Sequence, residues 1–155
     1  QQWQQKISQL PAAVLETIAA QLENQKLDHL VSKAFILRGE TSINDGEKVA
    51  CLRAISQSKD AASRQHWLKQ ILDKDNMVGV ELLATITSKC SKDLLKPVLM
   101  DLFIHQCAAD QGVFNGLVQE LMYQPKLRKK VLEAFRAEGR SPSVIQAIGV
   151  LMGQT

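Results

Sequence analysis

The stretch PKLRKKVLEAFRAEGRSPSVIQAIGVLM, residues 125–152, indicates the fold class more directly than any other part of the chain. Pro125 and Pro142 each begin a run of helical character, and proline suits the first position of a helix because its missing N–H has no partner there. Gly139 lies between the runs and suits the left-handed conformation that often ends a helix. The stretch therefore predicts two helices, over about 125–137 and 142–152, joined by a short turn.

The rest of the chain repeats this pattern. Pro11 begins PAAVLETIAAQL, in which apolar side chains recur at helical spacing, and no segment shows the alternation of a half-buried strand. Asp60 precedes another such run and is a favoured N-cap residue. We predict further helices over about 11–24, 26–38, 45–57, 61–73, 77–89, 97–109 and 112–123, with a short turn at 92–95.

Two of these helices carry detailed expectations. In the helix over 26–38, Gly39 is expected to act as a left-handed stop, and the inward residues are expected to be Leu27, Leu30, Val31, Ala34 and Leu37. The helix over 97–109 is apolar on nearly all sides until His105. A helix of that kind is usually buried, so we place it at the centre of the domain. The side chains expected to be almost fully buried there are Leu99, Leu102 and Phe103.

The length and composition favour one all-α domain over residues 1–155. The chain has 155 residues, 45% of them hydrophobic, which is enough for a sizeable core. About nine helices in pairs of roughly 30–38 residues fit either an orthogonal bundle or a HEAT-like stack of antiparallel helical hairpins. Residues 1–10 form a glutamine-rich lead-in, and the start QQWQQK, without an initiator Met, suggests a fragment of a longer protein.

The apolar segments and the cysteines bear on location. No stretch reaches the roughly 18–20 apolar residues that a membrane span needs. Cys51, Cys90 and Cys107 are odd in number, are widely spaced and form no C-x-x-C pair. Such cysteines favour a reducing compartment over a disulfide framework. We therefore expect an intracellular protein, cytoplasmic or nuclear.

The sequence offers little for catalysis. It contains no phosphate-binding glycine loop, no G-x-S-x-G and no H-E-x-x-H motif, so we expect neither an enzyme nor a cofactor. Asp101 and His105 share one helix face and could form half of a metal site or a histidine base with its orienting carboxylate. We prefer to read them as an i,i+4 polar pair at the solvent edge. No second ligand pair completes a site, so we predict no bound metal.

The basic residues are concentrated in one place. The net charge is +3, and residues 125–140 hold six basic residues against two acidic ones. With Leu127, Val131, Ala134 and Phe135 facing inward, a positive patch is expected on the opposite side of the helix. Its candidate binding residues are Lys126, Lys129, Lys130, Arg136 and Arg140. Such a patch can be a solvated face, or it can meet an acidic protein, a nucleic acid or a membrane surface.

Trp3 is the second candidate for partner contact, because it has few apolar neighbours in the lead-in; it either folds back onto the domain or anchors a partner. We favour a protein–protein interaction module, such as an adaptor, a regulatory subunit or a chaperone-like domain, whose partner is acidic or helical. The alternative is nucleic-acid binding through residues 125–140. It is less favoured because SPSVIQAIGVLM, the next helix, is too apolar to be a recognition helix in the major groove.

Overall fold

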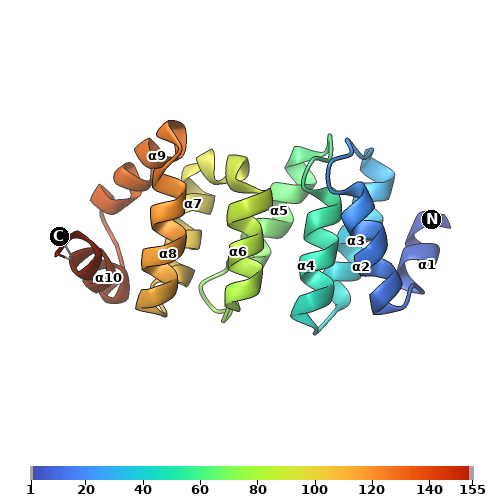
Figure 1. The fold of residues 1–155 in the computed structure, drawn as a ribbon, viewed down its shortest axis with the longest axis horizontal. Coiled ribbons are helices and arrows are strands. Elements are labelled where there is room, and N and C mark those ends of the chain that lie inside the picture. The colour runs from blue at the N-terminus through green and yellow to red at the C-terminus, as the bar shows by residue number, and fades with distance from the viewer. Residues whose placement is uncertain (1, 154–155) are drawn as a thin grey trace. The chain divides into compact units, whose positions relative to one another are not determined.

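The computed structural model describes residues 2–153, and within them every regular element is helical (Figure 1). The all-α prediction is confirmed, and each predicted helix is present. The elements are α1 (Gln2–Ser8), α2 (Ala12–Leu22), α3 (His29–Thr41), α4 (Asp45–Ile55), α5 (Ala61–Ile71), α6 (Val80–Lys89), the 3-10 turn η1 (Ser91–Leu95), α7 (Pro97–Cys107), α8 (Gln111–Met122), α9 (Pro125–Arg136) and α10 (Pro142–Gly153).

The chain divides into two compact units, Gln1–Gln70 and Ile71–Thr155. In the N-terminal unit, α1 packs on α3, α2 on α4, and α3 on α4. In the C-terminal unit, α7 and α9 each pack on α8 and on one another, while α8 also contacts α6 and α10. Inside each unit, helices pack on chain neighbours and on helices two apart, as they do in stacked helical hairpins.

Helix α3 begins later and ends later than we predicted. The side chain of Asp28 accepts a hydrogen bond from the backbone N–H of Val31 at 3.0 Å and so caps the helix start. Gly39 lies inside the helix and does not end it. Its φ is not positive, since Gly139 is the one residue with positive φ in the described part of the chain. A Cβ atom on Gly39 would overlap the ring of Trp67. Gly39 is therefore needed for close approach of α5 to α3, and the prediction of a left-handed stop was wrong.

The buried face of α3 also differs from the predicted one. Leu30 and Leu37, which we expected inside, are 63% and 40% exposed. Ala34 is buried as predicted, and Phe35 and Ile36, which were not among the predicted inward residues, are buried as well. The reason is the contact between Gly39 and Trp67, since Phe35 and Gly39 lie one turn apart and both turn toward the core.

Helix α7 is central to the C-terminal unit, where it packs on η1, α8, α9 and α10. Leu99 and Phe103 are buried as predicted, but Leu102 is partly exposed, so that part of the prediction was wrong. Val98, Asp101, Leu102 and His105 form one stripe along the helix that the neighbouring helices leave open. Within an apolar run, periodicity does not show which stripe stays uncovered.

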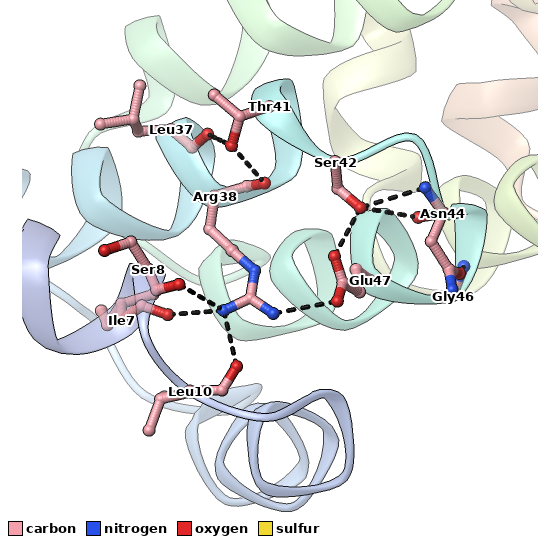
Figure 2. Close-up of polar contacts among 10 residues, drawn as sticks. All are labelled: Ile7, Ser8, Leu10, Leu37, Arg38, Thr41, Ser42, Asn44, Gly46 and Glu47. Atoms are coloured by element: carbon pink, nitrogen blue, oxygen red, sulfur yellow. Dashed lines mark hydrogen bonds and ion pairs between the residues drawn. The ribbon is translucent and has the colours of Figure 1, made fainter.

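A polar cluster fixes α1 to the rest of the N-terminal unit (Figure 2). The Nη1 atom of Arg38 donates to the backbone carbonyls of Ile7 at 2.8 Å, Ser8 at 3.3 Å and Leu10 at 2.8 Å, and its Nη2 atom donates to Oε1 of Glu47 at 2.9 Å. The carbonyls of Ile7 and Ser8 belong to the C-terminal end of α1, where a cation is favoured, and that of Leu10 lies just beyond it. Arg38 thus ties α1, α3 and α4 together.

Candidate functional site

The basic residues of α9 lie on one side of a strongly amphipathic helix. Leu127, Val131 and Phe135 recur every fourth residue and are buried against the unit. On the remaining surface, Lys126, Lys129 and Arg136 are exposed. Lys130 is half-buried and pairs with Glu133 at 3.3 Å. We call Lys126, Lys129, Lys130 and Arg136 the basic face of α9.

Arg140, the fifth predicted member of the patch, has a different place. Gly139 has φ of 76° and turns the chain at the end of α9. This turn brings the Nη1 atom of Arg140 to the backbone carbonyl of Phe135, to which it donates. Arg140 therefore caps the C-terminal end of the helix, where carbonyls lack intrahelical partners and a positive charge is favoured.

An exposed aromatic residue precedes the basic face, and the sequence analysis did not identify it as a candidate binding residue. Tyr123 follows α8 directly and stands three residues before Lys126, and it is 85% exposed. A tyrosine beside cations is a common anchor in binding surfaces, because it offers apolar area and a hydroxyl at a low entropic cost. The sequence prediction placed Tyr123 at the last position of the helix over 112–123, whereas α8 ends at Met122 and Tyr123 lies outside both helices.

Asp101 and His105 line a cleft of about 190 Å³ between α7 and the turn that joins α9 to α10. The Nδ1 atom of His105 lies 3.3 Å from the Oγ atom of Ser141. Burial lowers the pKa of His105 and raises that of Asp101, and the ammonium group of Lys74 lowers both. The other residues of the cleft include Lys74, Glu138 and Arg140.

This cleft does not have the geometry of a nucleophilic site. Ser141 Oγ accepts a hydrogen bond from the backbone N–H of Val144 at 3.4 Å and so serves α10 as its cap. No hydrogen bond between Asp101 and His105 is present in the described residues, so the histidine lacks the oriented carboxylate of a catalytic triad. Likewise, residues 2–153 contain no group of three or more His, Cys, Asp or Glu side chains placed to hold a metal ion.

A larger groove lies in the N-terminal unit, among α1, α3 and α5. Its volume is about 460 Å³, and its lining residues are Gln4, Lys33, Ile36, Leu37, Glu40, Ala62, Ser63 and His66. Trp3, which precedes Gln4 on α1, is 50% exposed, so it is neither folded into the core nor fully free. Sequence reasoning missed this groove, because three helices that are separate in the chain form it.

No helix among residues 2–153 combines the length and the apolar character needed to cross a membrane. No curated protein and no solved structure matches the chain. One family model, described as a protein of unknown function (DUF3549), matches residues 1–152. Because that match covers nearly the whole sequence, the chain belongs to the DUF3549 family.

Proposed function

We propose that this protein is a protein-interaction module that binds an acidic segment of a partner protein through the basic face of α9. The observation that carries the proposal is the placement of Lys126, Lys129 and Arg136, exposed on a helix whose opposite side is buried. None of these three cations has an ion-pair partner within residues 2–153. A fixed row of unpaired positive charge attracts an acidic surface and orients it.

The energetics point to contact at several residues at once. A single exposed ion pair contributes only about 0–1 kcal/mol, so one lysine would not hold a partner. The basic face provides several cations within three turns of one helix, and Tyr123 adds an exposed aromatic ring next to its start. Electrostatic attraction of this kind acts mainly on the association rate and weakens as salt is added.

An acidic protein fits this surface better than a nucleic acid does. Glu133 lies among the residues of the basic face and pairs with Lys130, so it lowers the net positive charge, on which binding to the polyanionic backbone of a nucleic acid depends most. The helix that follows, α10, exposes Ile145, Val150 and Met152, which have no hydrogen-bonding groups for base edges. We therefore make nucleic-acid binding an outcome of the test.

The test uses the whole chain as bait in a lysate of its source cells, with and without nuclease. The variant carries Lys126→Glu and Lys130→Glu. The matched control carries Lys26→Glu and Lys69→Glu, two exposed lysines in the N-terminal unit, and so has the same net charge. We expect the parent and the control to retain an acidic partner after nuclease treatment, while the α9 variant loses several-fold in affinity at low salt and less at high salt.

Two results would overturn the proposal. One is equal affinity of the α9 variant and the control for the purified partner at low salt, which would make the basic face a solvated surface. The other is loss of all captured material after nuclease treatment, together with binding of a labelled 20-base-pair DNA or RNA duplex that depends on Lys126 and Lys130. That second result would identify a nucleic-acid-binding domain.

The state of the cysteines supports an intracellular, reducing location as part of the proposal. Cys51, Cys90 and Cys107 are buried, and none of them forms a disulfide within residues 2–153. Burial raises the pKa of the Cys51 thiol to about 12 and also raises that of Cys107, so neither is a reactive thiolate at neutral pH. We expect three alkylated thiols when protein from its source cells is quenched in denaturant with iodoacetamide, and a disulfide found there would contradict this location.

A further inference from the structure

We infer that the groove among α1, α3 and α5 is a second docking site, and that its occupant is an amphipathic helix of a partner protein. This helix would place apolar side chains in the groove, an acidic side chain against Lys33 and a basic side chain against Glu40. The inference adds a surface to the proposed function and does not depend on the basic face of α9.

The inner surface of the groove is suited to apolar side chains. Ile36, Leu37 and Ala62 contribute apolar surface from two helices, and Leu37 is 40% exposed although it lies in the middle of α3. Leu30, which is 63% exposed, lies two turns earlier on the same face and continues the apolar stripe. The volume of about 460 Å³ is enough for several side chains rather than for one.

The charges beside the groove determine which helix would fit. Lys33 and Glu40 line it seven residues apart on α3, a separation of about 10 Å along the helix. Neither has an ion-pair partner within residues 2–153. Arg38 on the same helix makes the contrast clear, because its guanidinium bonds to Glu47 and to three backbone carbonyls. A partner helix with one acidic and one basic residue at matching separation would pair both open charges.

The spacing of the lining residues favours a helix over other occupants. One helix face carries the lining residues Lys33, Leu37 and Glu40, with Leu30 beyond the groove, at the i, i+3, i+7 repeat, and a second helix packed along this face presents the same repeat. An added strand would need unpaired backbone groups along an edge, which helices do not offer. Gln4 and His66 on the other helices add polar side chains to the border of the groove.

Both walls of the groove are held in place before any partner binds. Arg38 fastens the end of α1 (Figure 2), and the ring of Trp67 seats α5 against Gly39 of α3. Trp67 is only 2% exposed, so this contact is part of the core. A groove with fixed walls loses little conformational entropy when it binds, which improves affinity.

The experiment is a selection from a phage-displayed library of 16-residue peptides on the immobilised full chain. The parent is compared with a charge-swapped variant, Lys33→Glu with Glu40→Lys, and with Leu37→Asp. All three substitutions are at exposed positions, and circular dichroism checks that each variant is folded. We expect the parent to enrich peptides with an apolar helical stripe and opposite charges seven residues apart. We expect the swapped variant to enrich the reversed charge order.

Binding of the enriched peptides is then measured by fluorescence anisotropy. Leu37→Asp should weaken it at least about tenfold, because a carboxylate would enter the apolar groove. The inference fails if parent and swapped variant enrich the same peptides, if Leu37→Asp leaves binding unchanged, or if no peptide that depends on Leu37 is enriched. Peptides lost only with Lys126→Glu and Lys130→Glu would place the binding on α9, which would overturn the groove and leave the proposed function standing.

Discussion

Replacement of Arg38 by methionine should loosen α1 from the N-terminal unit. The side chain of Arg38 is only 11% exposed and that of Glu47 22%. Methionine keeps much of the side-chain volume but removes the positive charge and four hydrogen bonds, three of them to carbonyls at or just after the end of α1. Glu47 would then keep the bond from Ser42 at 2.5 Å but lose its cation.

The size of the loss in stability follows from Glu47, whose carboxylate stays partly buried without its cation. Removal of one member of a buried ion pair costs about 3–5 kcal/mol, because the remaining charge is desolvated without compensation. Since Glu47 keeps some contact with water, we expect the lower end, about 3 kcal/mol of the free energy of unfolding. Urea denaturation followed by circular dichroism measures this loss, and hydrogen exchange over residues 2–8 should show that α1 is the first element released.

Two further measurements separate the charge from the packing. In Arg38→Met with Glu47→Met, no unpaired charge remains, so this double variant should be more stable than Arg38→Met alone.

In the parent, hydrogen bonds from Ser42 and Arg38 lower the pKa of Glu47 against the opposing effect of burial. The stability from this shift is present above the unfolded pKa of Glu47 and is lost as pH falls through the folded value. A loss under about 1 kcal/mol in Arg38→Met would refute this account of α1.

The remaining predictions concern packing. Gly39→Ala should destabilise the protein by about 1–3 kcal/mol, because the new methyl group meets the ring of Trp67. Gly149→Ala, where a Cβ meets nothing within 4 Å, should be neutral or stabilise by up to about 1 kcal/mol. Phe103→Ala should cost about 3–5 kcal/mol, and Leu102→Ala clearly less because Leu102 is partly exposed. Urea denaturation compares all four, and equal losses within either pair would contradict the packing described for it.

The features predicted correctly from the sequence are those that depend on a residue and its near neighbours. Pro125 and Pro142 stand at the first positions of α9 and α10, and Gly139 has the positive φ expected of it. These outcomes follow from backbone chemistry, which acts within one or two turns. The buried stripe of α9 was likewise readable, because its helical period is interrupted by no other signal.

Gly39 shows why other features were not readable. A glycine near a helix end can supply a positive φ or can make room for another segment, and the local sequence looks the same in both cases. Only the position of Trp67, which lies 28 residues further on, decides between them. Arg140 is a second example. Its place in the sequence beside a basic helix suggested that it belongs to the positive patch, whereas in the structure its guanidinium donates a hydrogen bond to the carbonyl of Phe135 in α9.

Three features could be predicted from the amino-acid sequence: the helical class, the ends of most helices, and the concentration of positive charge on α9. Each of these follows from local propensity, capping and period. The covered faces of α3 and α7, and the groove among α1, α3 and α5 with Lys33 and Glu40 beside it, became visible only once the helices were packed together. The physical reason is that burial and open charge depend on which helices meet, and those contacts join residues that are far apart in the chain.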